Sequence, residues 1–278
     1  MPVPENFTAS FIFTIIIYYV IITINIGKLY NEGLVMALWV LFGICLVVQV
    51  FCVPWYLKAL WPEKCTKSLV LKMVCSTMFV GIGVLSMFIS NNFSSYAITM
   101  LIGLVLGWIG DYFLHAKPSD VYFVTGFASF LIGHFFYIGA YVRVLPKLFP
   151  DYKMLNAPEL VVAAVVLVLA FVMLKLTKMK MTPKIVAFGI WLYFIILTFM
   201  FIKASALGYN QWQSGAEGGI IAFAVLTLGS FFFLLSDASL GVIMFADQKK
   251  NYPLKIFNIV TYFWGQIMLA SSILFINA

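Results

Sequence analysis

The sequence contains few charged residues: Asp, Glu, Lys and Arg make up only 10% of its 278 residues, while 64% are hydrophobic. The mean hydropathy is +1.06. This composition excludes a soluble domain of the same size, which needs a polar surface. No basic segment with interleaved aromatic residues is present to hold a nucleic acid, so the net charge of +7 is better explained by lysines in short loops. The composition predicts a polytopic membrane protein that lies in the bilayer. No nucleic-acid partner is predicted.

The sequence also lacks the common cofactor motifs. Its four cysteines form no CxxC pair and have no histidine nearby, so we interpret them as small buried apolar residues. Walker, Rossmann and HExxH patterns are absent. The sequence therefore predicts no metal site and no nucleotide or redox cofactor.

Apolar segments of membrane-spanning length recur along the whole chain. Nine candidate spans are found at about residues 7–29, 34–57, 67–90, 95–115, 120–143, 158–177, 184–203, 217–245 and 254–276. The first is too long for a signal peptide and is predicted to be a retained span. The longest connections, near 58–66, 144–157 and 204–216, are too short for a soluble domain. We expect one all-α transmembrane bundle of eight to nine spans, forming a single domain over residues 1–278.

The lysines and arginines are distributed unequally between the two sides of this bundle. With nine spans, one side receives Lys58, Lys64, Lys67, Lys72, Lys117, Lys175, Lys178, Lys180, Lys184, Lys249, Lys250 and Lys255, and the other Lys28, Arg143, Lys147, Lys153 and Lys203. The positive-inside rule then places the N-terminus in the cytoplasm. We expect the endoplasmic reticulum membrane if the source is a eukaryote and the plasma membrane if it is a bacterium.

Two aspartates, Asp111 and Asp237, interrupt apolar spans. A carboxyl group at bilayer depth is unfavourable, so it indicates a functional site. Gly103 and Gly107 precede Asp111 at four-residue steps. Small residues also share the helix face of Asp237: Gly219, Ala222, Ser230 and Gly241. Because small residues let helices approach closely, both carboxyl groups are predicted to face the bundle interior.

The predicted topology places several polar residues at one depth in the cytoplasmic half of the bilayer. Asp111 lies ~9 Å of helix rise before Lys117, and Asp237 lies ~15 Å before Asp247. Lys72 lies ~8 Å of helix rise inside its span. Tyr262 and Gln266 continue a polar stripe that begins at Asn258. Together these residues predict a buried polar cavity. His134 and Tyr137 also face the interior, but His134 is predicted ~21 Å deep, at the far end of the cavity or in a structural role.

Each of these residues has a simpler alternative role. Lys72 can extend its ammonium group to the headgroups, and Tyr262 can belong to the interfacial aromatic belt. Gln266 can merely hydrogen-bond a neighbouring helix. Either aspartate can be a helix cap or one half of a structural ion pair.

Four blocks in order along the chain resemble the signatures of the YhhN-like lysoplasmalogenase family: LGWIGDYFLH, GFASFLIGHFFY, GSFFFLLSD and TYFWGQ. The resemblance covers about residues 68–276, and the spans within 7–57 are less well matched. It implies a polytopic enzyme that hydrolyses the vinyl-ether bond of lysoplasmalogens to a fatty aldehyde and glycerophosphoethanolamine or glycerophosphocholine. The substrate partner it implies is thus a lysophospholipid.

The resemblance also implies site residues. The matching positions are Gly110 and Asp111, His134 and Tyr137, Ser236 and Asp237, and Tyr262 and Gln266, with Lys72 at the start of an early span. Many relatives have proline after that lysine, whereas this chain has Met73. We expect Asp111 and Asp237 to be catalytic and Lys72, His134, Tyr137, Ser236, Tyr262 and Gln266 to support the site or bind substrate.

Vinyl-ether hydrolysis suits two buried carboxyl groups. Proton transfer to the β-carbon gives an oxocarbenium ion, which needs a protonated acid and a second carboxylate, as in glycosidases. Which aspartate is the acid, which headgroup is preferred and the oligomeric state stay open at this stage. An alternative is a proton-coupled transporter using the same acids, although no paired repeats are present. A non-catalytic lipid-binding protein would leave the two carboxyl groups unexplained.

Overall fold

The structure is a computed structural model that describes residues 5–179 and 184–277, with side chains over 32–179 and 188–277. Its elements are α1 (Glu5–Leu60), α2 (Thr66–Ile89), α3 (Ser95–Ala116), α4 (Asp120–Leu148), α5 (Ala157–Leu176), α6 (Lys184–Gln213), α7 (Gly219–Phe245), α8 (Tyr252–Ser271) and the short 3₁₀ helix η1 (Ser272–Leu274). Eight helices in this part of the chain are long and apolar enough to cross a membrane. The prediction of an all-α, multi-pass membrane protein is confirmed.

Polar residues at the turns determine where several helices begin. The side chains of Ser94, Asn156 and Asn251 accept hydrogen bonds from the first turns of α3, α5 and α8, and Pro158 and Pro253 occupy the first turns of α5 and α8. At the start of α2, Cys65 and Ser68 form a reciprocal capping box. These caps satisfy backbone N–H groups that would otherwise lack partners at the helix start.

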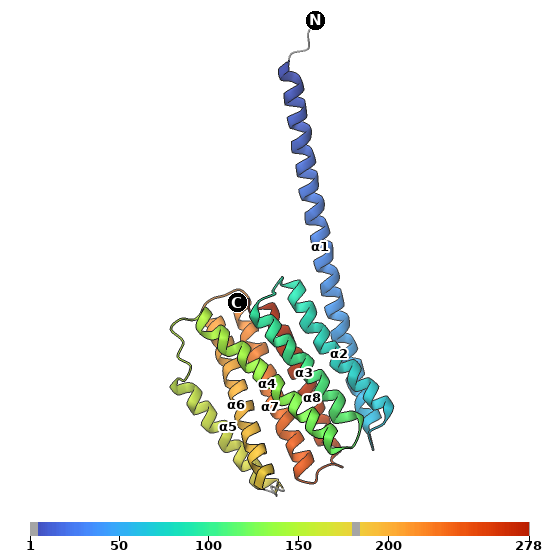
Figure 1. Ribbon diagram of the computed structural model, residues 1–278, viewed down its shortest axis with the longest axis vertical. Helices are drawn as coiled ribbons and strands as arrows, with labels where there is room; N and C mark the ends of the chain where they lie inside the picture. The colour runs from blue at the N-terminus through green and yellow to red at the C-terminus, as the bar shows by residue number, and fades with distance from the viewer. Residues whose placement is uncertain (1–4, 180–183, 278) are drawn as a thin grey trace. The chain divides into compact units, whose positions relative to one another are not determined.

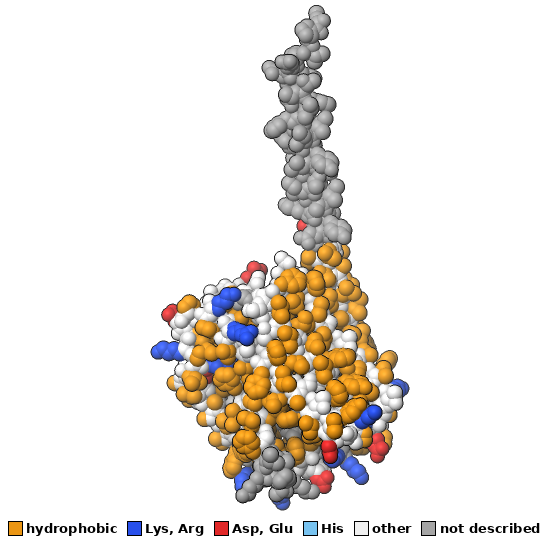
Figure 2. All heavy atoms as spheres, in the orientation of Figure 1, with side chains coloured by type: hydrophobic (Ala, Val, Ile, Leu, Met, Phe, Trp, Pro, Cys, Tyr) orange, Lys and Arg blue, Asp and Glu red, His pale blue; other side chains and the backbone are white. Residues whose placement is uncertain are grey.

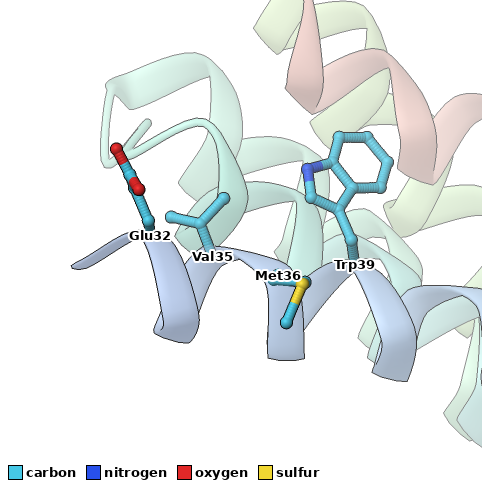
Figure 3. Close-up of a pocket in the computed structure, with 4 residues that line it drawn as sticks. All are labelled: Glu32, Val35, Met36 and Trp39. Carbon is cyan, nitrogen blue, oxygen red and sulfur yellow. The ribbon is translucent and has the colours of Figure 1, made fainter. Parts of the chain in front are cut away.

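The chain forms two compact units, residues 1–41 and 42–278. In the first unit, Glu32, Val35, Met36 and Trp39 lie on successive turns of α1 and line a shallow hollow along the helix (Figure 3). For the predicted span at 7–29, the structure describes the backbone and not the side chains. Helix α1 runs without interruption through residues 30–33, where a connection was predicted. That prediction was wrong because these polar residues include no proline and fit a helix.

The second unit is a bundle of antiparallel helices. Helices α3, α4, α7 and α8 have neighbours on several sides, whereas α5 packs beside α6 at the edge of the bundle (Figure 1). Hydrophobic side chains cover most of the visible flank of this unit, and charged side chains lie mainly near its two ends (Figure 2). Such a surface is typical of a protein whose flank contacts lipid.

The sixth span is longer than the sequence predicted. Helix α6 continues to Gln213, so most of the loop predicted at 204–216 is helical. Close packing accounts for the extension: a Cβ added at Gly208 would lie 2.7 Å from the Cα atom of Phe223 in α7. Lys203, which was predicted at the edge of that loop, is instead fully buried within α6. Tertiary packing therefore overrides the polar character of this segment.

Candidate functional site

The Asp111 carboxylate is the centre of a hydrogen-bonded cluster formed by α2, α3 and α8. Its Oδ1 atom lies 2.8 Å from the Lys72 Nζ atom. Its Oδ2 atom accepts hydrogen bonds from the hydroxyls of Ser76, at 2.5 Å, and Tyr262, at 2.7 Å. Asp111 is 1% exposed. One ammonium and two hydroxyl donors stabilise its charged form in a buried position.

The cluster continues from Tyr262 along α8 to α4. The Tyr137 hydroxyl donates to Gln266 Oε1 at 2.9 Å, and Gln266 Nε2 lies 3.5 Å from the Tyr262 hydroxyl. Glycine makes these contacts possible, because a Cβ at Gly103 would lie 2.5 Å from the Tyr137 ring and one at Gly107 would lie 2.9 Å from Gln266 Nε2. The predicted small-residue stripe therefore admits the polar side chains of two other helices.

Asp237 has different surroundings. Its Oδ2 atom accepts a hydrogen bond of 2.5 Å from the Tyr193 hydroxyl. The nearest nitrogen of His134, Nε2, is 3.8 Å from the same oxygen, too far for a hydrogen bond. Neither ring nitrogen of His134 has a hydrogen-bond partner among the described residues. Among those residues, no lysine or arginine forms an ion pair with Asp237.

The two aspartates occupy one region of the bundle interior. The Phe233 ring lies between their surroundings, 4.9 Å from the His134 ring and 5.7 Å from the Tyr262 ring. His134 lies beside Asp237, although the helix rise counted from Asp120 predicted a deeper position in the membrane. The first residues of α4 are exposed, so the count from Asp120 overstates its depth in the packed bundle.

The predicted site residues differ in how directly they reach the carboxylates. Lys72 and Tyr262 contact Asp111, Gln266 and Tyr137 follow through hydrogen bonds, and His134 lies beside Asp237. The hydrogen bonds of Ser236 in the described part of the chain do not involve the Asp237 carboxyl group. Its carbonyl and hydroxyl oxygens accept hydrogen bonds from Asn258 Nδ2 at 2.7 and 3.1 Å, which tie α7 to α8.

Sequence reasoning missed Tyr193 as a site residue, because a tyrosine in the aromatic run of α6 has no distinguishing spacing. It also missed His115, whose Nε2 lies 2.8 Å from the Ser68 hydroxyl and whose Nδ1 lies 3.5 Å from the Tyr56 hydroxyl.

The end of α3 that carries His115 is the Ala116 end of the bundle, where α1, α3 and α7 end and α2, α4 and α8 begin.

A second hollow opens between α1 and α8, with a volume of about 160 Å³. Its lining residues are Gln49, Val50, Val53, Pro54, Val260, Phe263, Trp264 and Ile267. Gln49 is 3% exposed, and both polar atoms of its amide lack hydrogen-bond partners among the described residues. Phe263 separates this hollow from Tyr262, which precedes it in α8 and lies 5.0 Å away between ring centroids. Neither Asp111 nor Asp237 lines this hollow or the hollow that Glu32 and Trp39 help to form.

The described residues include no group of three or more His, Cys, Asp or Glu side chains placed to hold a metal ion. The arrangement around the two aspartates can support proton transfer. Asp111 forms an ion pair with a lysine, whereas Asp237 has no cationic partner among the described residues.

Comparison with known proteins agrees with the sequence blocks. No curated protein and no solved structure matches the chain significantly. A family model does match, over residues 67–273, and this range contains Lys72, both aspartates and all their contacts described above. The chain belongs to the YhhN family.

Proposed function

We propose that this protein is a membrane hydrolase that cleaves the vinyl-ether bond of lysoplasmalogens. The products are a fatty aldehyde and glycerophosphoethanolamine or glycerophosphocholine. Membership of the YhhN family and the resemblance of its sequence blocks support this assignment. The single observation that carries it is the contrast between two buried carboxyl groups: Asp111 contacts an ammonium and two hydroxyls, whereas Asp237 accepts from one hydroxyl.

This contrast assigns the roles in the first step. Burial favours the neutral form of a carboxyl group that lacks a cationic partner, so Asp237 is the proton donor. Its proton forms a C–H bond at the β-carbon of the vinyl group, and the ether oxygen and α-carbon become an oxocarbenium ion. Asp111, held as a carboxylate by Lys72, stabilises that cation. We place the vinyl group at the Phe233 ring, between the two acids.

The second half of the reaction returns the proton. Asp237, now a carboxylate, takes a proton from water as the water oxygen bonds to the oxocarbenium carbon. The resulting hemiacetal loses its hydroxyl proton and breaks its bond to the glycerol oxygen, which leaves with a proton. The aldehyde and the glycerophospho-alcohol are then released. His134 is suited to hold or pass the proton because it lies beside Asp237 and both of its ring nitrogens lack other partners.

The hollow between α1 and α8 offers a place for the distal part of the substrate's hydrocarbon chain, which reaches it from the Tyr262 side once the Phe263 ring turns aside. Its walls are apolar apart from Gln49, and on α8 it begins beside Tyr262 and continues away from the Ala116 end. An aliphatic chain there would bury apolar surface without leaving the membrane interior. The lysine distribution places the Ala116 end in the cytoplasm, so we propose entry from the cytoplasmic leaflet.

The experiment is aldehyde release by purified protein in detergent, with vinyl-ether and ester lysolipids compared. We expect release from the vinyl ether alone, and losses of at least about 100-fold in kcat for Asp111→Asn and Asp237→Asn. Asp120→Asn, an exposed change at the start of α4, is the matched control. Full activity in either buried variant would remove that residue from the mechanism. A transporter would release no aldehyde in this single-compartment assay.

A further inference from the structure

Three lysines from different segments approach one another at the Ala116 end of the bundle. They are Lys64 in the α1–α2 connection, Lys72 in α2 and Lys255 in the first turn of α8, here called the lysine cluster. The Lys64 Nζ atom donates to the Leu114 carbonyl at 2.7 Å, and Lys72 pairs with Asp111 one turn earlier in α3. Lys255 lies over the Trp61 ring, 5.6 Å from its centroid, in the connection that carries Lys64.

The members of the lysine cluster repel one another. The surrounding protein, which desolvates the ammonium group, and the charges of Lys72 and Lys255 lower the pKa of Lys64 from 10.5 to about 8. Among the described residues, neither Lys64 nor Lys255 forms an ion pair with a carboxylate. After its bond to Leu114, Lys64 retains two N–H donors. A group of like charges with free donors is a site for an anion.

The aromatic residues around the cluster place it at the level of lipid headgroups. The Trp61 and Tyr252 rings lie 4.8 Å apart, and Trp61 is 42% exposed. Both residues lie where an apolar span ends or begins, the position in which tryptophan and tyrosine favour the membrane interface. The anion most available at that level is the phosphate of a phospholipid.

We propose that Lys64 and Lys255, with Lys72 behind them, bind the phosphate group of the lysophospholipid substrate. This inference rests on the proposed function and names the headgroup subsite of the same active site. In this proposal Lys64 and Lys255 donate to the phosphate, and Lys72, which pairs with Asp111, adds positive charge behind them.

The spacing along α3 fits a glycerophospholipid. Lys64 contacts the carbonyl of Leu114, and the reacting carboxylate belongs to Asp111, three residues earlier. This separation is ~4.5 Å along the helix axis, comparable with the three-carbon glycerol that joins the phosphate to the vinyl ether. Lys72, whose side chain is 13% exposed, contacts Asp111 at the deeper of these two levels. A phosphate held at Lys64 therefore directs the vinyl-ether end toward Asp111.

The first test measures binding alone, with a 1-O-alkyl lysophospholipid, which has no vinyl ether to cleave, and purified full-length protein. We expect Lys64→Gln and Lys255→Gln each to raise its Kd about tenfold. The matched control is Lys58→Gln, in the last turn of α1, which should leave the Kd unchanged. Unchanged binding in both cluster variants would overturn the proposal, and so would an equal loss in the control.

The second test separates headgroup recognition from chemistry. For Lys64→Gln we expect KM for lysoplasmalogen to rise about tenfold, with kcat and the KM for 1-alkenylglycerol, which lacks phosphate, unchanged. Equal changes for both substrates would overturn the subsite. If no variant or wild-type protein releases aldehyde while the binding difference persists, the proposed hydrolysis fails and the phosphate site stands.

A competition test distinguishes a lipid headgroup from a free phosphate. We expect glycerophosphate to compete with the alkyl lysophospholipid in wild type and not in Lys64→Gln, and inorganic phosphate to compete more weakly. Inorganic phosphate that competes as well as the alkyl lysophospholipid itself would overturn headgroup binding, because the site would then recognise the free ion.

Discussion

Two buried lysine–carboxylate pairs in this bundle illustrate different uses of the same interaction. Lys203 of α6 lies 2.6 Å from Glu159 of α5, and Lys72 of α2 lies 2.8 Å from Asp111 of α3. Lys203 also donates to the Tyr152 hydroxyl, at 2.9 Å, and to the Met154 carbonyl, so all three of its donors are used. The surrounding protein and Glu159 raise the pKa of Tyr152 above its usual value.

The Lys72 pair differs on the lysine side. Both carboxylates accept from three side-chain donors, but Lys72 has one carboxylate partner and its side chain is 13% exposed. A lysine with every donor satisfied holds elements together. A lysine with donors to spare, beside an anion in a partly open position, can respond to a substrate. The comparison teaches that unused donors on a partly exposed lysine separate the candidate catalytic pair from the structural pair.

The largest expected effect separates the pairs by stability. Lys203→Met leaves the buried Glu159 carboxylate without its cationic partner, although Tyr152 and Asn156 still donate to it, which costs about 3–5 kcal/mol. We expect a marked fall in the Tm of purified protein, measured by thermal denaturation, with aldehyde release per folded molecule unchanged. A normal Tm for this variant would contradict the structural role of the pair.

Lys72→Met should show the converse. It removes the ammonium that pairs with the Asp111 carboxylate, so we expect kcat for aldehyde release to fall about 100-fold. The Tm should fall less than in Lys203→Met because the Lys72 side chain is partly exposed and has one partner, whereas Lys203 is fully buried and joins three. Lys72→Arg, which keeps the charge, should recover part of kcat. Wild-type kcat in Lys72→Met would place Lys72 outside the mechanism.

A smaller effect is expected where glycine admits Tyr137 to the cluster. Gly103→Ala places a methyl group 2.5 Å from the Tyr137 ring, which should destabilise the protein by about 1–3 kcal/mol. Gly139→Ala in α4 is the control, because no atom lies within 4 Å of the added methyl group there. We expect the control to be neutral or slightly stabilising, by up to about 1 kcal/mol. Equal Tm values in the two variants would argue against close packing at Gly103.

The smallest effect concerns pH. Because the pKa of Lys64 is lowered to about 8, its ammonium is charged below that pH and loses its charge above it. Binding of the alkyl lysophospholipid should therefore weaken by a few-fold between pH 7 and pH 9, measured as Kd. The charged and titratable groups facing Lys64 are Lys72 of α2, His115 of α3 and Lys255 of α8.

Lys64→Gln is the control for this pH dependence. The variant should bind more weakly at pH 7 and show a flatter profile up to pH 9, because the group that titrates has been removed. A profile with the wild-type slope would assign the change to another group.

Much of the fold was predictable because apolar length is a local property of the chain. The spans at 67–90, 95–115 and 217–245 agree with α2, α3 and α7 to within a few residues. The predictions failed at the continuous α1, where residues 30–33 include no proline, and at the end of α6, where polarity and packing disagree. The end of α6 depends on its close approach to α7, which the segment by itself does not reveal.

The sequence by itself determined the membrane class, the approximate spans and the presence of unusual acids at bilayer depth, because hydropathy and residue type act locally. Only the tertiary structure decided the partners. Lys72 joins Asp111, Tyr193 joins Asp237, and Lys203 is a buried structural residue rather than a loop lysine. The reason is physical: a buried polar group takes the partner that helix packing brings within hydrogen-bond distance, and that partner is remote along the chain.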